Sequence, residues 1–73
     1  EAQVLSTSPI NGQKISEIGF PEGAIVGGVL KGKQMIMPTG STRIEEGDVI
    51  VLFVLSKDVR TVEKLLQVSI DFV

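Results

Sequence analysis

The side chains that could do chemistry are few, and the densest group of them is acidic. Glu45, Glu46 and Asp48 place carboxylates within one short segment. Carboxylate oxygens can bind Ca²⁺ or Mg²⁺, but calcium loops alternate more oxygen ligands than this segment offers. Carboxylates that share acid–base chemistry face each other across a cleft, whereas these follow one another along a turn. The segment therefore predicts a solvated turn, with a cation site as the less favoured alternative.

Nucleophilic catalysis has little to draw on in this chain. Histidine and cysteine are both absent. Ser, Thr or Lys would have to be activated without the usual base. The nearest pairings are Lys14 with Ser16 and Lys57 with Ser56, and both fall in expected cap or surface positions. The sequence therefore predicts that the protein is not an enzyme and has neither a catalytic nor a metal site.

A glycine-rich stretch from Gly27 to Gln34 matches the G-x-x-x-x-G-K part of a phosphate-binding loop. The match fails at Gln34, where that loop needs Ser or Thr for the magnesium ion. The Gly-Lys pair also leads into a second strand instead of a helix whose N-terminus could hold phosphate. The stretch is interpreted as a β-hairpin.

Four residues of this hairpin are candidates for a ligand or subunit contact. Gly27 and Gly28 interrupt a strand, which favours a β-bulge, or a close approach by a partner or a ligand. Met35 and Met37 alternate with an isoleucine and so share one face of the returning arm. Methionines in such positions are more often core filling, although an adaptable subunit contact is an alternative.

Length and composition indicate one small globular domain. The chain has 73 residues, of which 42% are hydrophobic and 22% charged. Below roughly 80 residues, a hydrophobic core rarely supplies more than about 3–5 kcal/mol. Without cysteine or histidine, oligomerisation or docking onto a neighbouring domain is the expected compensation. The net charge of −2 and the scattered lysines and arginines exclude a phosphate-backbone binder, so no nucleic-acid partner is predicted.

The first half of the chain alternates short apolar segments with turn formers. Glu1–Leu5 is predicted to form a short strand, and Gln13–Ile18 a short helix that ends at Gly19. Ala24–Leu30 and Gln34–Met37 are predicted to form the two arms of the hairpin. Because the chain begins with glutamate, we expect it to be part of a longer protein.

The second half contains the most apolar segment. A polar surface loop is predicted over Thr39–Glu46, followed by a strand over Asp48–Leu55 that is buried on both faces. Ser56 is the predicted N-cap of a helix over Lys57–Leu66. Val68–Val73 alternates apolar and polar residues, which favours either a final strand or a segment that packs on a partner, Phe72-Val73 included. The predicted fold class is α+β, a small mixed or antiparallel sheet with two helices on one face.

Three motifs in order along the chain resemble one known family. Ser8-Pro9-Ile10-Asn11-Gly12 precedes Lys14-Ile15, the hairpin carries Lys31-Gly32-Lys33 at its tip, and a third block follows. That block consists of Pro38, Thr42, Ile44, Gly47, Asp48 and Ile50. Over roughly Val4 to Leu66, the chain resembles the TrkA-C domain, also called the RCK or KTN C-terminal lobe, of Trk potassium-uptake regulatory subunits. Pro38, Thr42, Gly47 and Asp48 are read as the structural signature.

The resemblance implies a cytoplasmic, non-catalytic regulatory domain that forms homodimers. In that family the lobe follows a Rossmann-type domain that binds NAD or ATP, and the whole protein gates a membrane potassium transporter or channel. A nucleotide cofactor would therefore belong to a missing N-terminal part, and this domain itself would carry none. Some related lobes bind a cyclic dinucleotide at the dimer interface. The alternative is an interaction module without a ligand that docks a neighbouring domain or the transporter.

Overall fold

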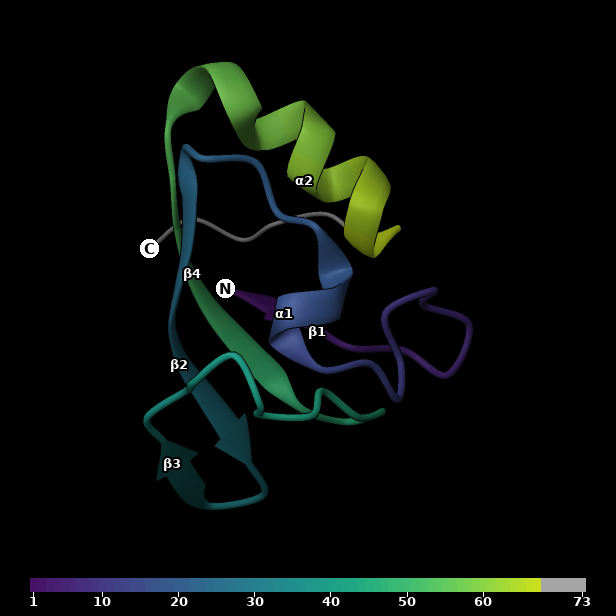
Figure 1. Ribbon diagram of the computed structural model, residues 1–73. Coiled ribbons are helices and arrows are strands. Elements are labelled where there is room, and N and C mark those ends of the chain that lie inside the picture. Colours follow the sequence, from purple (N-terminus) through teal and green to yellow (C-terminus); the bar gives the residue numbers. More distant parts are fainter. Residues whose placement is uncertain (68–73) are drawn as a thin grey trace.

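One antiparallel sheet forms the framework of the protein, whose computed structural model describes residues 1–67. Its strands are β1 (Ala2–Gln3), β2 (Ala24–Lys31), β3 (Gln34–Ile36) and β4 (Val49–Val54). They lie side by side in the order β1-β4-β2-β3 (Figure 1). The hairpin of β2 and β3 confirms that the Gly-Lys stretch is a turn between strands.

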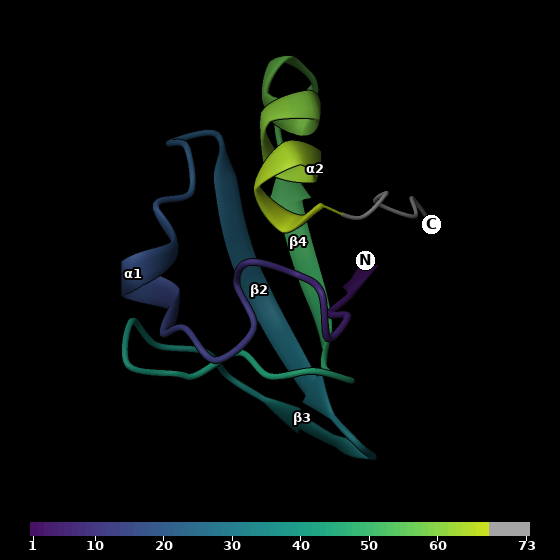
Figure 2. The same cartoon turned by 90° about the vertical axis from the view of Figure 1, so that its right-hand side faces the viewer.

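Both helices lie on the same side of this sheet (Figures 1 and 2). Helix α1 spans Ile15–Ile18 and α2 spans Val59–Leu66, preceded by a turn of 3₁₀ helix, η1 (Ser56–Asp58). The α+β architecture with helices on one face is therefore confirmed. None of the helices within residues 1–67 has the length and apolar character needed to cross a bilayer.

The core fills the space between the sheet and the helices. Its fully buried side chains come from the sheet, from α2 and from the loop before β4, and they are Val29, Ile44, Ile50, Val62 and Leu66. Ile44 lies in the segment that was predicted to be a polar surface loop. That prediction is wrong at Ile44, because its backbone is hydrogen-bonded to Gly12 and Gln13 and its side chain is part of the core.

Helix α1 ends as predicted, at Gly19 in the left-handed conformation with φ 76°. Its first free N–H groups are already used, since Ile15 donates to the Thr42 carbonyl at 2.9 Å and Ser16 to the Gly40 carbonyl at 3.0 Å. At this N-terminal end, the Glu17 side chain also accepts the Lys14 N–H at 2.8 Å. The loop before β4 therefore supplies the acceptors for the first turn of α1.

The prediction that Ser56 caps the last helix is wrong. Ser56 begins the 3₁₀ turn η1, and Asp58 stands at the start of α2 without a side-chain capping bond. The chain leaves β4 through this tighter turn, closed by the Asp58 N–H donating to the Leu55 carbonyl at 2.8 Å. The α-helix consequently begins at Val59, farther along the chain than predicted.

Strand β4 is not buried on both faces, which corrects the second prediction for this segment. Ile50 is fully buried, but Phe53 is 66% exposed. Because both helices cover the same face of the sheet, alternate residues of β4 point to a face that the described chain leaves bare. The prediction for Val68–Val73 lies outside the described residues.

The N-terminal loop is tied to the end of α2 by one buried hydrogen bond. The Ser8 hydroxyl donates to the Leu66 carbonyl at 2.7 Å. This carbonyl lies in the last turn of the helix, where backbone acceptors lack an intrahelical partner. Ser8 thereby closes the contact between two segments far apart in the sequence.

We expect Ser8→Ala to lower the free energy of unfolding by about 1–2 kcal/mol, since it leaves a buried acceptor unsatisfied. Urea titration followed by circular dichroism measures the change. Ser6→Ala, on an exposed serine of the same loop, is the matched control and should stay within about 0.5 kcal/mol of the parent. Equal losses in the two variants would contradict the assigned role of Ser8.

Candidate functional site

The face of the sheet away from the helices is apolar and uncovered within residues 1–67. Ile25 on β2 lies directly across from Phe53 on β4, and the two are 65% and 66% exposed. Their neighbours Ala24, Val26, Leu52 and Val54 pack against the core instead. Since successive side chains of a strand alternate between faces, Ile25 and Phe53 lie on the bare side. We call this surface the outer face.

A β-bulge in β2 shapes the middle of the outer face. Val26 pairs with Leu52 and Gly28 with Val51, which leaves Gly27 as the extra residue. A Cβ on Gly27 would overlap the ring of Phe53, and one on Gly28 would lie 2.8 Å from the Met35 sulfur. The predicted bulge is therefore confirmed, and the close approach to the glycines is made by the chain's own side chains. A contact of Gly27 and Gly28 with a partner or ligand stays a prediction.

The methionines are not core filling, so that expectation is wrong. Met35 is 53% exposed and Met37 79% exposed. The reason is topological, because β3 is a three-residue edge strand that extends past the area covered by the helices (Figure 1). Met35, paired across the hairpin with Leu30, adds its side chain to the outer face. The placement favours the alternative prediction of an adaptable contact.

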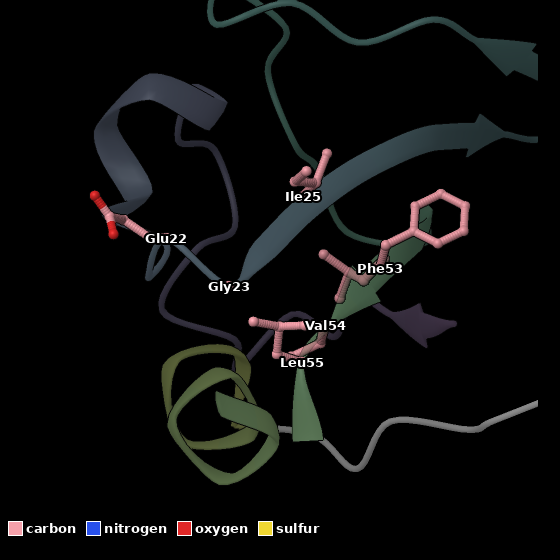
Figure 3. A pocket seen from close by; sticks show the side chains of 7 residues that line it. Glu22, Gly23, Ile25, Phe53, Val54 and Leu55 are labelled. Carbon is pink, nitrogen blue, oxygen red and sulfur yellow. The ribbon is translucent and has the colours of Figure 1, made fainter. Parts of the chain in front are cut away.

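A shallow groove lies where the outer face meets the end of β4 (Figure 3). Its walls come from the start of β2 and the end of β4, and the residues are Glu22, Gly23, Ile25, Leu52, Phe53, Val54 and Leu55. Figure 3 shows the Glu22 carboxylate at the opposite end from the Phe53 ring. With one titratable group in an apolar lining, the groove is suited to binding apolar surface and not to acid–base chemistry.

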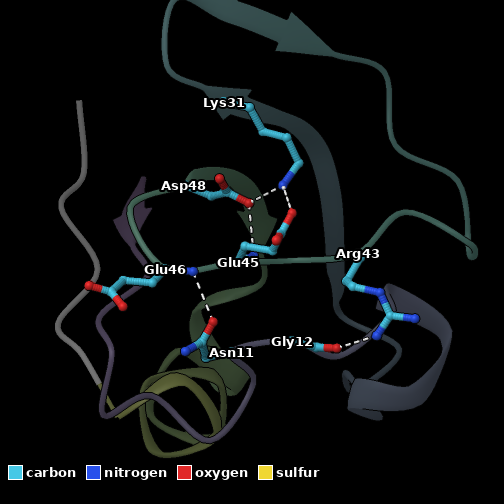
Figure 4. Close-up of polar contacts among 7 residues, drawn as sticks. All are labelled: Asn11, Gly12, Lys31, Arg43, Glu45, Glu46 and Asp48. Atoms are coloured by element: carbon cyan, nitrogen blue, oxygen red, sulfur yellow. Dashed lines mark hydrogen bonds and ion pairs between the residues drawn. The ribbon is translucent and has the colours of Figure 1, made fainter.

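The acidic segment is not a fully solvated turn, because Asp48 is only 6% exposed. Its Oδ2 accepts the Glu45 N–H at 2.8 Å and lies 2.5 Å from the Lys31 ammonium (Figure 4). Lys31 also pairs with the Glu45 carboxylate at 3.2 Å. The prediction of a solvated turn is therefore wrong for Asp48, whose charge is neutralised internally. No cluster of three or more potential metal ligands occurs in the described part of the chain.

The ammonium of Lys31 is held in its charged form by this arrangement. Burial alone would lower the pKa of Lys31, but hydrogen bonds and charge interactions with Asp48 and Glu45 outweigh that effect. The net result raises the pKa of Lys31 above its ordinary value. The ion pair thus fastens the end of β2 to the turn that precedes β4.

The first and third motifs of the sequence signature bind each other through the backbone. Gly12 donates to the Ile44 carbonyl at 2.7 Å, and Ile44 donates to the Gln13 carbonyl at 2.8 Å. Asn11 Oδ1 accepts the Glu46 N–H at 2.9 Å (Figure 4). These hydrogen bonds hold the two motifs together and give them a structural role.

The remaining signature residues shape the loop before β4. Thr42 Oγ1 accepts the Thr39 N–H at 2.9 Å, and Gly47 has a φ of 88°, which other residues rarely adopt. Of the Ser–Lys pairs, Ser56 begins η1 while the Lys57 ammonium lies 3.4 Å from Asp58. The backbone N–H of Ser16, in the first turn of α1, donates to the Gly40 carbonyl. These residues build the fold, and none of them forms a reactive constellation.

Comparison with solved structures defines the class of fold. A structure entitled "Structure of RCK domain with cda" superposes with a TM-score of 0.74, covering 88% of this chain and 90% of the other, at 19% sequence identity. The protein therefore has the fold of an RCK domain lobe.

The family follows from the sequence comparisons. The family model of the TrkA-C domain matches residues 1–67, and the chain belongs to this family. Proteins named "Trk system potassium uptake protein TrkA" match at 36% identity over 99% of the chain in Azorhizobium caulinodans and at 41% over 94% in Haemophilus influenzae. A Methanosarcina mazei protein, "Trk system potassium uptake protein TrkA homolog 2", is 48% identical over 80% of the chain. The chain spans only 13–16% of the length of these three relatives. The resemblance seen in the motifs is confirmed.

The raised pKa of Lys31 predicts a specific loss of stability at alkaline pH. A group whose pKa is raised by folding contributes stability below its unfolded pKa, about 10.4 for lysine, and loses it as pH rises through the folded pKa. Lys31→Arg keeps a positive charge throughout this range. We therefore expect the free energy of unfolding of Lys31→Arg to fall less than that of the parent above about pH 10.

Denaturant titrations between about pH 8 and about pH 11.5 measure this difference. Lys33→Arg, at an exposed position of the same hairpin, controls for the general effect of replacing a lysine. Its pH dependence should follow the parent. An identical alkaline loss in all three proteins would contradict the role given to the Lys31 ion pair.

Proposed function

We propose that this domain is a non-catalytic regulatory lobe of a potassium-uptake regulator and that it acts by forming a homodimer through the outer face. The uncovered apolar face is the observation that carries the proposal. Single exposed apolar residues are common, but a contiguous apolar patch on a small domain marks an interaction site. The names of the relatives support potassium uptake as the process that is regulated.

A second copy of the chain is a suitable occupant because the central residues of the outer face are uncharged. In a two-fold interface the same patch lies on both subunits, so a charge near the symmetry axis would face its own copy. Ile25, Phe53, Leu55 and Met35 bring no charge to such a contact. Apolar burial can then stabilise the pair without like-charge repulsion.

The dimensions of the molecule indicate how much of the outer face a dimer would use. The protein measures 30 × 25 × 24 Å. One side of a domain with these extents is comparable in scale to the roughly 800 Å² that each partner buries in a stable complex. An interface of that size would extend from the groove at Leu55 to Met35 on the edge strand.

The regulatory part of the proposal needs an interface with two arrangements. A small ligand such as a nucleotide or cyclic dinucleotide would favour one of them by binding it more tightly. NAD or ATP would act on a Rossmann-type domain preceding this one in a longer chain. Through that longer protein, the lobe would act at the cytoplasmic side of a membrane potassium transporter. The second candidate is an interaction module that senses no ligand and docks a neighbouring domain through the same apolar face.

We expect Ile25→Lys to weaken self-association at least about tenfold, because each interface would then bury two like charges. Analytical ultracentrifugation over a concentration series gives the dissociation constant. Gln34→Lys makes the same change of charge at an exposed position of β3 and should alter it less than about twofold. Unchanged association of Ile25→Lys would refute the outer face as the interface.

The same two substitutions test regulation in the longer protein. With potassium uptake by cells as the readout, Ile25→Lys should impair regulated uptake, and Gln34→Lys should not. Normal uptake with Ile25→Lys, at equal protein abundance, would separate self-association from the transport function.

Thermal-shift screening distinguishes a ligand-sensing lobe from an interaction module. A ligand present at about 100 times its Kd stabilises the folded state by about 2.7 kcal/mol, which corresponds to a rise in Tm of well over 5 °C for a domain of this size. Nucleotides and cyclic dinucleotides are the compounds to test on the parent domain. A shift with one of them, reduced in Ile25→Lys, favours ligand sensing at the interface. No shift with any compound favours the module without a ligand.

A further inference from the structure

Sulfur chemistry in this chain is confined to two side chains. The sequence contains two methionines and no cysteine. Met35 lies on the edge strand β3, and its sulfur is 2.8 Å from the position that a Cβ of Gly28 would occupy. Its Cε and Cγ are farther from that position, at 3.7 and 3.9 Å. The sulfur is therefore the atom of Met35 that sits directly on the bare backbone of Gly28.

We propose that Met35 is an oxidation-sensitive site whose conversion to the sulfoxide loosens the hairpin and weakens association through the outer face. Hydrogen peroxide is the oxidant. It transfers one oxygen to the thioether, so that an S–O bond forms and the O–O bond breaks. The sulfur is oxidised by two electrons, and the peroxide leaves as water. The thioether becomes a polar, chiral sulfoxide.

The contact between the Met35 sulfur and Gly28 explains why a sulfoxide at this position would be disruptive. A thioether sulfur has two lone pairs that can accept the oxygen. Oxygen on the side facing Gly28 has no room, because even a Cβ there would lie 2.8 Å from the sulfur. Oxygen on the other side can be solvated in the free protomer, where Met35 is half exposed, but a second copy packed on the outer face would bury this acceptor without a donor. One epimer therefore displaces Met35 from Gly28, and the other disfavours association through the outer face.

The hairpin has little else to hold its edge strand. β3 pairs with β2 over three residues, and Met35 opposite Leu30 is the middle pair. The effect on association rests on the proposed function, since it requires that the outer face is the dimer interface. Oxidation would occur in a protomer whose outer face is uncovered, where Met35 is 53% exposed. The oxidised protomer would then associate less well.

Met37 supplies a comparison within the same chain. It is 79% exposed and lies beyond the end of β3. Peroxide can reach it at least as easily, but oxygen on its sulfur can remain in solvent. The contact of its sulfur with Gly28, and not exposure alone, is therefore what makes oxidation of Met35 disruptive.

The test uses Met37→Leu and Met35→Leu, each of which retains a single thioether. Leucine and methionine have similar volumes, so both variants should fold. Each is treated with hydrogen peroxide until mass spectrometry shows one added oxygen, and the Tm and the dissociation constant are measured before and after treatment. Oxidised Met37→Leu, which carries the Met35 sulfoxide, should associate at least about tenfold more weakly, with a Tm lower by about 4 °C or more. Oxidised Met35→Leu should change less than about twofold, and methionine sulfoxide reductases should restore Met37→Leu.

The possible failures are distinguishable. If untreated Met37→Leu and Met35→Leu are both monomeric, the proposed dimer is wrong, and the Tm alone decides the role of Met35. If fully oxidised Met37→Leu keeps its Tm and its association, the proposal for Met35 is overturned. The same holds if Met35 resists peroxide under conditions that fully oxidise Met37.

Discussion

The fold depends on the way one buried carboxylate is satisfied. Asp48 precedes the central strand β4, and its Oδ2 holds both the Glu45 N–H and the Lys31 ammonium. A buried charge without such partners would cost several kcal/mol, a large share of what a small core can supply. Through this carboxylate the turn before β4 is fixed to the end of β2. The Gly47 turn leads into β4 with its register already set.

Much of the architecture could be predicted from the sequence because local chemistry and global fold agree there. Gly19 ends α1, the Gly-Lys turn forms a hairpin, and the paired glycines form a bulge. The burial of β4 could not be predicted. Its apolar run of seven residues is equally compatible with two covered faces and with one covered face that awaits a partner. The sequence records that both faces are apolar, but not what covers each of them.

The same limit explains the misplaced site residues. Met35 and Met37 were expected in the core because apolar side chains usually are, but their exposure follows from a short edge strand that no pattern reveals. Asp48 was expected in solvent because it belongs to an acidic turn, and its pairing with Lys31, which is distant along the chain, leaves no local signal. The burial of Ile44 could not be predicted either, because a single apolar residue in a polar loop shows no periodicity. In each case a tertiary contact overrides the local signal.

The edges of the sheet limit the ways in which copies of this protein can assemble. β1 has two residues and β3 has three, so each edge offers few free backbone groups to another strand. Growth by adding strands would run on without closure and lead to fibres, whereas contact through a face closes on itself after two copies. Short edges beside an apolar face therefore favour a finite complex over open-ended polymerisation. Within residues 1–67, the sheet therefore offers little free strand edge on which further chains could pair.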